Sequence, residues 1–412
     1  MSADCSHAEP RRCGEVQPSG IAWFGDVPEG WKVRKLFGSF TENKDKNKSL
    51  AYTRAMQFNY GRIVDKKESL DSGEVKEIYS KYSLVRKNDI IINGLNLNYD
   101  FVSQRVAISP KEGIITSAYI ALRPRQGISP SYYCYLFKSM DSKKMFHGLG
   151  TGIRLTLSFK ELRNLPLPVP PLPEQEAIVK YLDEATGKID KAIEAEEKMV
   201  ALLQERKQII IHQSVVMRSG WDVKKAKILF VPEKRPVRQD DDIVTCFRDG
   251  QVTLRKNRRT EGFTNALKEF GYQGVRRGDL VIHNMDAFAG SIGISDSDGK
   301  MSPVCTICTT RRSDVCPAFY AFYLRNLARM GYIKSLARGI RERSTDFRWG
   351  DFKELQLPLP TLTEQEAIVK QLDEEMGKID RAIAVKRRQI ELLRERREII
   401  INEVVTGKVK VA

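Results

Sequence analysis

Two long segments of the chain repeat apolar residues at the alternating spacing of three and four that is typical of a coiled-coil helix. In the segment Glu174–Ile211 we predict that the seam is formed by Ile178, Leu182, Ala185, Ile189, Ala192, Met199, Leu203 and Ile210. In Glu364–Ile401 the matching positions are Ile368, Leu372, Ile379, Ala382, Leu393 and Ile400. Each segment is therefore predicted to be one long helix with an apolar side against which another helix packs.

The two helical segments are copies of each other, because they share the runs EQEAIVK, LDE, GKID and III in the same order. The shift in numbering that maps Glu174 onto Glu364 also maps two upstream segments onto each other. It relates Gly30–Val33 to Gly220–Val223, and Val85–Ile90 to Val275–Leu280. The whole chain therefore consists of two copies of one unit, in which a globular domain is followed by a long helix.

Outside the helical segments, short apolar runs alternate with turn residues, which indicates strands. We predict strands at Asp89–Asn93, Ile114–Thr116, Ala118–Leu122, Asp279–His283 and Val304–Cys308, and amphipathic helices around Ser131–Lys138 and Pro317–Met330. The predicted fold class is α+β, with two tandem globular domains that each contain helices and strands. The two long helices are predicted to pair as an antiparallel coiled coil with an internal pseudo-twofold axis.

Each globular domain ends in a stretch rich in proline, Leu165–Pro173 in the first copy and Leu357–Thr363 in the second. Alternating Leu and Pro fits neither a helix nor a central strand, so we expect a stiff, extended connector. The predicted division is a polar, disordered segment at 1–18, domains with their connectors at 19–173 and 219–363, the first long helix at 174–218, and the second long helix with a tail at 364–412.

The middle of each long helix carries charges of opposite sign. The acidic residues Glu194, Glu196 and Glu197 lie in the first helix, and the basic residues Lys386, Arg387 and Arg388 lie at the matching place in the second. An antiparallel pair within one chain brings the two clusters together, whereas two copies of one helix place like charges together. The pattern therefore favours pairing inside one chain over a homo-oligomer. The alternative is that these are simply solvated charges.

The formal net charge of the 412 residues is +16, and the long helices do not supply it. Glu174–Val216 has six basic and nine acidic residues, and Glu364–Thr406 has nine basic and ten acidic. The positive excess therefore lies in the rest of the chain, largely in the two globular domains. Basic folded domains beside nearly neutral helices indicate a polyanionic partner, most simply nucleic acid.

The first domain opens with SGIAWFGDVPEGWKVRKL and ends in LPLPVPPLPEQEAIVKYLDE, and the second domain ends in the repeat LPLPTLTEQEAIVKQLDE. Through these motifs the chain resembles, over residues 19–412, the specificity subunit of a type I restriction-modification system. The resemblance implies two target-recognition domains that each recognise one half of a bipartite duplex DNA site, and helices that hold them apart. One departure is that Thr361 and Thr363 replace the prolines Pro171 and Pro173 of the first copy.

The resemblance also implies partners and an absence of catalysis. The helices would dock the methyltransferase (modification) subunits and the restriction/translocase subunits. No catalytic residue and no cofactor are expected in this chain, since S-adenosylmethionine, ATP and Mg would be held by the partner subunits. Because the globular domains have diverged while the helices have not, the two half-sites are expected to differ, which makes the target asymmetric.

Candidate DNA contacts lie in loops rich in basic or amide side chains, because amides and guanidinium groups pair with base edges. In the first domain the candidates are Lys44, Lys46, Lys48, Asn93, Asn96, Asn98 and Arg154, and in the second they are Arg255, Lys256, Arg258, Arg259, His283, Asn284, Arg341 and Arg343. The arginines of the repeated Gly-Ile-Arg, Arg154 and Arg341, are the strongest candidates. Asn-rich loops are also common as plain turns.

Other chemistry has weaker support in the sequence. The spacing of Cys305, Cys308 and Cys316 is compatible with zinc, but the second pair of a zinc ribbon is missing, and buried core cysteines explain it better. No phosphate-binding Gly-x4-Gly-Lys-Ser/Thr loop is present. Two alternatives stay open: a self-contained modification enzyme, and a structural coiled-coil scaffold whose basic domains bind RNA or acidic protein. No apolar run is long enough to cross a bilayer as a helix, so we expect a cytoplasmic protein without a membrane span.

Overall fold

The computed structural model describes residues 11–12, 15–21, 23–59, 61–66, 73–153, 155–258, 270–336 and 346–411. The chain forms two compact units. Unit 1 comprises Met1–Glu196 and Arg388–Ala412, and unit 2 comprises Glu197–Arg387. Each unit contains one globular domain together with part of each long helix. The division into five consecutive segments that we made from the sequence stays a prediction.

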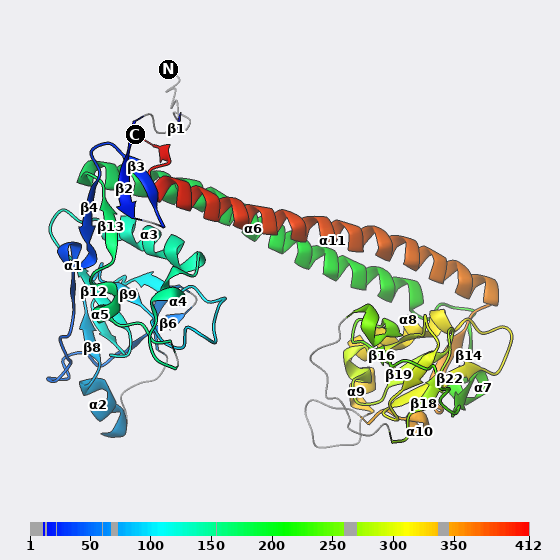
Figure 1. The fold of residues 1–412 in the computed structure, drawn as a ribbon. Helices are drawn as coiled ribbons and strands as arrows, with labels where there is room; N and C mark the ends of the chain where they lie inside the picture. Colours follow the sequence, from blue (N-terminus) through cyan, green and yellow to red (C-terminus); the bar gives the residue numbers. More distant parts are fainter. Residues whose placement is uncertain are drawn as a thin grey trace. The chain divides into compact units, whose positions relative to one another are not determined.

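A four-stranded antiparallel sheet forms the centre of the first domain (Figure 1). Its order is β10 (Val106–Ile108), β9 (Ile90–Ile92), β12 (Ile120–Pro124) and β5 (Phe40–Glu42). All three residues of β9 are buried, as expected for a central strand that is covered on both faces. The helix α3 (Pro130–Ser142) packs its aromatic side chains into the same core, and its first turn is capped by the Ser129 hydroxyl.

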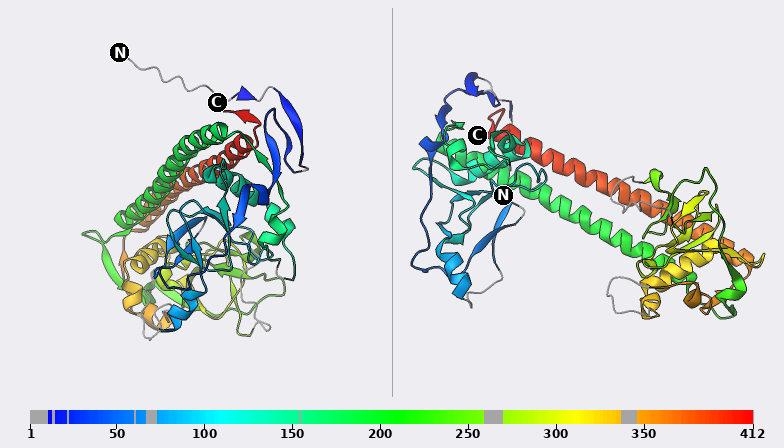
Figure 2. Two further views of the ribbon diagram at one scale, coloured as in Figure 1. Left: turned by 90° about the vertical axis from the view of Figure 1, so that its left-hand side faces the viewer. Right: turned by 60° about the horizontal axis from the view of Figure 1, so that its bottom comes forward.

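Smaller ladders and short helices surround this sheet. The ladders are β2 (Val16–Ile21) with β3 (Gly25–Pro28), β4 (Lys32–Lys35) with β13 (Pro166–Val169), β6 (Met56–Asn59) with β7 (Arg62–Asp65), and β8 (Ser83–Val85) with β11 (Gly113–Ile115). The short helices are α1 (Leu36–Ser39), α2 (Gly73–Ser80), α4 (Met145–Leu149) and α5 (Phe159–Leu162). Strand β1 (Arg11–Arg12) pairs with β24 (Val409–Lys410) next to the C terminus (Figure 2).

The second domain repeats this architecture. Its central sheet has the order β20 (Ile292–Ile294), β19 (Leu280–His283), β22 (Cys305–Thr310) and β15 (Phe230–Glu233), with α8 (Pro317–Arg329) in the place of α3. The other elements are β14 (Asp222–Lys225) with β23 (Gln356–Leu359), β16 (Val244–Cys246) with β17 (Val252–Leu254), β18 (Gln273–Val275) with β21 (Gly299–Met301), α7 (Ala226–Leu229), α9 (Tyr332–Ser335), α10 (Trp349–Phe352), and the 3-10 turns η1 (Arg255–Asn257) and η2 (Ala287–Ala289).

These elements confirm the predicted mixture of helices and strands, and two details differ. The proline-rich connectors are extended, but part of each is a strand in a two-stranded ladder, β13 in one domain and β23 in the other. A two-stranded ladder accepts proline because the unpaired side needs no N–H donor. The expected disorder over 1–18 does not hold at Arg11–Arg12 or from Val16 onward, where strands form, while 1–10 and 13–14 lie outside the described residues.

The two long helices are α6 (Leu172–Val215) and α11 (Leu362–Val405), each of 44 residues. Both begin slightly before the predicted boundaries at Glu174 and Glu364. No helix among the residues that the structure describes is long and apolar enough to span a membrane. All the predicted seam positions except Met199 are buried or half-buried, and Leu182, Leu372 and Ile379 are among the buried ones.

At two predicted seam positions the next residue along the helix is the more buried one. Met199 is 44 % exposed, and its neighbour Val200 packs against the core of unit 2 instead. In the second helix Ile383 is buried where we predicted Ala382. Both neighbours are apolar at each position, so the heptad pattern allowed either choice.

Within each unit, parts of the two long helices lie together. In unit 1, Ile178 and Leu182 of α6 share an apolar cluster with Ile401 of α11, and the Arg397 guanidinium lies 3.0 Å from an Asp190 carboxylate oxygen. In unit 2 the Lys207 ammonium lies 2.6 Å from Asp380. The shift that relates the two helices in the sequence converts one ion pair into the other, so both copies of the helix use the same contact.

Candidate nucleic-acid interface

The predicted amide residues of the first domain lie on one loop that follows the central strand β9. Asn93 is half-buried, and its Oδ1 accepts a hydrogen bond of 3.1 Å from the backbone N–H of Leu95. Asn96 is exposed and has a φ of 51°, in the left-handed region that Asn tolerates. The Asn98 amide donates to the Ile153 carbonyl at 3.3 Å. The structure therefore brings the three asparagines together.

A buried arginine holds this loop in shape. The side chain of Arg105 is only 2 % exposed. Its guanidinium donates to the carbonyl oxygens of four loop residues, at 2.8–3.4 Å, and these are Asn93, Leu95, Asn96 and Asp100. The backbone N–H of Arg105 donates in turn to Asp141 of α3 at 2.6 Å. A loop with this many internal hydrogen bonds is pre-organised before it meets a ligand.

Large apolar side chains project from the tip of the same region. Tyr99 is 77 % exposed, Val102 93 % and Ile153 98 %. Phe101 stacks on the His147 ring with a centroid distance of 4.7 Å. Exposed apolar side chains on an ordered loop mark a contact surface, and apolar or aromatic groups contact thymine methyl groups and unstacked bases.

The equivalent loop of the second domain is built differently. His283 ends β19, and its Nδ1 accepts a hydrogen bond of 3.1 Å from the backbone N–H of Asp286. Burial is the main reason why the pKa of His283 is lowered, so the imidazole stays neutral near pH 7. Asn284 is buried, and its Oδ1 accepts from the Thr306 hydroxyl at 2.7 Å. Asn284 therefore supports the loop, whereas His283 remains partly accessible.

A wide cleft of about 1210 Å³ opens beside His283 in the second domain. Its wall contains three arginines, Arg248, Arg255 and Arg258, and exposed apolar side chains that include Phe270 and Met285. Arg258 lies over the Phe247 ring, 4.2 Å from its centroid. Basic groups interleaved with aromatic rings suit a nucleic acid, because the former meet phosphates and the latter meet bases.

Several of the basic candidates already have acidic neighbours. Arg258 is 2.8 Å from Asp249, Lys256 is 2.6 Å from Asp242, and Lys44 is 2.8 Å from Glu42. Exposed ion pairs of this kind contribute little free energy, so phosphate groups can compete for the cations. Lys46 donates to the hydroxyls of Ser83 and Ser117, so its side chain links separate segments of the domain. Lys48 is exposed.

Four predicted contacts, Arg154, Arg259, Arg341 and Arg343, lie outside the described residues. The central helix charges are described, and among them Arg388 pairs with Glu391 of its own helix at 3.0 Å. Pairing between the acidic and basic clusters stays a prediction.

The cysteines do not form a metal centre within the ranges that the structure describes, where no group of three or more His, Cys, Asp or Glu residues could hold an ion. Cys305 and Cys308 lie in different apolar clusters. Burial raises the pKa of both thiols, that of Cys305 to about 12. A zinc ligand needs the thiolate, so these side chains are suited to core packing.

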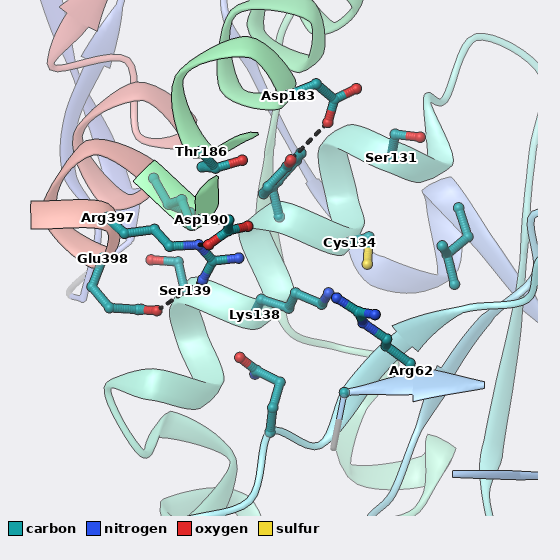
Figure 3. Close-up of a pocket in the computed structure, with 15 residues that line it drawn as sticks. Arg62, Ser131, Cys134, Lys138, Ser139, Asp183, Thr186, Asp190, Arg397 and Glu398 are labelled. Carbon is teal, nitrogen blue, oxygen red and sulfur yellow. Dashed lines mark hydrogen bonds and ion pairs between the residues drawn. The ribbon is translucent and has the colours of Figure 1, made fainter. Parts of the chain in front are cut away.

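A second kind of pocket lies in unit 1 (Figure 3). Its volume is about 450 Å³, and α3, α6 and α11 supply most of its lining. The Tyr135 hydroxyl donates to Asp183 at 2.7 Å, and burial chiefly raises the pKa of Tyr135 to about 12. Arg397 and Asp190 form its other wall. These contacts join the domain to the long helices, and none of the predicted DNA contacts lies there.

Comparison with known proteins matches this architecture to one family. Residues 28–198 match the family model described as the type I restriction modification DNA specificity domain. The chain is 25 % identical to the type I restriction enzyme MjaVIII specificity subunit of Methanocaldococcus jannaschii, over 93 % of this chain and 94 % of that protein. The chain is similar to type I specificity subunits. It is also 25 % identical to the putative MjaX specificity subunit of the same organism, over 94 % of this chain and 95 % of that one.

Two solved structures share the fold of this chain. A chain from a study of complex assembly and conformational transition of the type I R-M system superposes with a TM-score of 0.69 at 14 % identity, covering 93 % of this chain and 99 % of that one. The HsdS subunit from Thermoanaerobacter tengcongensis superposes with a TM-score of 0.52 at 16 % identity, covering 93 % and 98 %. The likeness confirms that two copies of an α+β domain with a long helix form a known fold.

Sequence reasoning missed the residues that shape the site. Arg105 is one arginine among many in a basic chain, and only its complete burial reveals its role. The repeated glutamines Gln175 and Gln365 were visible within EQEAIVK, but their function was not. Each is fully buried, and each bonds both the end of its connector and the segment that leads into α3 or α8.

Proposed function

We propose that this chain is the non-catalytic DNA specificity subunit of a type I restriction-modification complex, and that its two domains recognise the two halves of an asymmetric duplex site. The observation that carries this proposal is a repeated scaffold with unlike loops. The same strand order recurs in both domains. The loop after the central strand, however, closes at Arg105 in the first domain and at Ser291 in the second, and these are residues of different chemistry. Equal frames with different loops are suited to two different sequences.

The proposed partner surface for the methyltransferase and restriction subunits lies on the long helices. Besides the buried seam, each helix has an outer apolar stripe that repeats once per heptad. Leu202 and Ile209 form it in unit 2, and the equivalent Leu392 and Ile399 form it in unit 1, each 47–49 % exposed. A stripe at this spacing is the surface that a further helix packs against. S-adenosylmethionine, ATP and Mg belong, in this proposal, to those partner subunits.

We further propose that α6 and α11 pair antiparallel along their length within one chain, which disfavours a homo-oligomer. The support is the pair of equivalent contacts, Arg397 with Asp190 in unit 1 and Lys207 with Asp380 in unit 2. From the first pair to the second, the residue number in α6 rises from 190 to 207, while the residue number in α11 falls from 397 to 380. This is the order expected for helices that run in opposite directions. The clusters at Glu194–Glu197 and Lys386–Arg388 belong to the same proposed pairing.

The experiment that tests the proposed function is methylation mapping of host DNA with and without the gene, in cells that contain the partner subunits. We expect one two-part, asymmetric motif to be methylated only when the chain is present. The proposed site of action is the cytoplasm, where bacterial and archaeal DNA lies. An unchanged methylation pattern, or a palindromic motif, would contradict the proposal.

A rival function is a coiled-coil scaffold whose basic domains bind RNA or acidic protein. Competition separates the two, since the specificity subunit should prefer duplex DNA containing the mapped motif over RNA of equal length at the same salt concentration. Equal displacement by both would favour the scaffold.

A further inference from the structure

Asn93 and His283 occupy the same position in the two domains. Each directly follows or ends the equivalent central strand, β9 or β19, and the shift that relates the two long helices also relates these two residues. The backbone N–H of each donates to a residue at the start of the next strand in the sheet, Asn93 to the Arg105 carbonyl at 2.9 Å and His283 to the Ser291 carbonyl at 3.0 Å. The two side chains therefore leave the sheet at the same point, although one is an amide and the other an imidazole.

In both residues, a nearby backbone N–H occupies the acceptor atom of the side chain. Leu95 donates to Oδ1 of Asn93, and Asp286 donates to Nδ1 of His283, both at 3.1 Å. An imidazole whose Nδ1 accepts must have its proton on Nε2 while it is neutral. An amide whose Oδ1 accepts must direct Nδ2 to the other side. Each residue is thus left with a free donor, and His283 has no acceptor left.

These donors have no acceptor in the described part of the chain, since the hydrogen bonds that the Asn93 and His283 side chains make within it use only their acceptor atoms. His283 lines the cleft of the second domain, beside Arg248 and Met285. The charged groups near the imidazole are Asp286, 3.7 Å from Nδ1, and Arg248, which pairs with Asp286 at 2.8 Å. This carboxylate is therefore held on the Nδ1 side.

We propose that Nδ2 of Asn93 and Nε2 of His283 are equivalent base-recognition donors, each selecting a hydrogen-bond acceptor on a base edge in its own half-site. Suitable acceptors in the major groove are N7 of purines, O6 of guanine and O4 of thymine, whereas the amino group of cytosine is rejected. This inference rests on the proposed function. It adds the direction of one hydrogen bond in each half-site, from a protein donor to a base acceptor. It also excludes Asn284 as the base-contacting residue, because its side chain is buried against Thr306.

The test uses the full chain in complex with its methyltransferase subunits and a duplex containing the mapped motif. Asn93→Asp keeps the acceptor for Leu95 but removes the donor. The matched control is Asn88→Asp, which adds the same charge at an exposed position of the same domain that is not a predicted DNA contact. We expect Asn93→Asp to weaken binding between about fivefold and a hundredfold more than the control does. The loss should vanish on a duplex with a scrambled first half-site.

A set of 7-deazapurine and O4-lacking thymine analogues then locates the contact. One analogue position in the first half-site should weaken the wild-type complex and have no further effect on Asn93→Asp. His283→Asp should behave in the same way in the second half-site. His283→Asn should bind more tightly than His283→Asp, because Asn supplies a donor and is the residue that the first domain uses at this position.

Equal binding by Asn93→Asp and Asn88→Asp, or analogue effects that add to those of the variants at every position, would overturn the inference. A wild-type complex that does not distinguish the mapped motif from a scrambled duplex would instead refute the proposed function. Thermal unfolding of each variant shows that the loop remains folded.

Discussion

At the scale of single residues, the buried guanidinium of Arg105 determines the shape of the first recognition loop. We predict that Arg105→Met lowers the free energy of unfolding by about 3 kcal/mol, because four loop carbonyls lose their donor inside the protein. Urea denaturation measures the loss. The control Lys111→Met, at a side chain that is 51 % exposed, should change stability by less than about 1 kcal/mol. Similar effects of both variants would show that Arg105 does not hold the loop.

At the scale of elements, the repeated glutamines lock each long helix to its own domain. Gln365 accepts from the backbone N–H of Cys316 at 2.8 Å and donates to the Pro360 carbonyl at 2.9 Å, and Gln175 makes the same pair of bonds with Ser129 and Pro170. We predict that Gln365→Leu costs about 2 kcal/mol and speeds hydrogen exchange at the start of α8.

The equivalent change Gln175→Leu should act at the start of α3 and leave α8 unchanged. Hydrogen exchange followed by mass spectrometry distinguishes the two sites. The control Gln371→Leu lies at an exposed position of α11 and should leave both helices protected as in the wild type. Exchange that rises equally in both domains would mean that the glutamines have no local role.

At the scale of the whole molecule, the proposed role of α6 and α11 is to set the gap between the half-sites. We predict that one heptad inserted after Ala195, with a second heptad after Val385, lengthens the gap by about three base pairs. A heptad adds about 10 Å of helix and retains the phase of the seam. Each base pair adds about 3.4 Å to the duplex.

Methylation mapping of the matched insertion is the measurement, and both half-sites should keep their sequence. An insertion of one heptad in α6 alone serves as the control, and it should reduce stability because only one helix is lengthened. A folded, active double insertion with an unchanged gap would show that the helices do not set the distance between the half-sites.

The sequence by itself determined the repeat, the two long helices, the α+β class and the resemblance to type I specificity subunits. These features depend on periodicity and on short local runs, which need no knowledge of distant contacts. The strands around Ile90–Ile92 and Leu280–His283 were predicted for the same reason. The constant shift between the two copies also paired Asn93 with His283 correctly, because an equal strand order preserves equivalent positions.

Only the tertiary structure decided which apolar residues face the seam and what each polar candidate does. Met199 and Val200 are both apolar neighbours in a heptad, and packing alone selects Val200. Asn284 looked like a DNA contact beside His283, yet its side chain turns inward to Thr306. Arg105 became important because it is buried among carbonyl groups that come from a separate loop. Burial and hydrogen-bond partners depend on residues far away in the chain, and this is why local sequence patterns could not assign these roles.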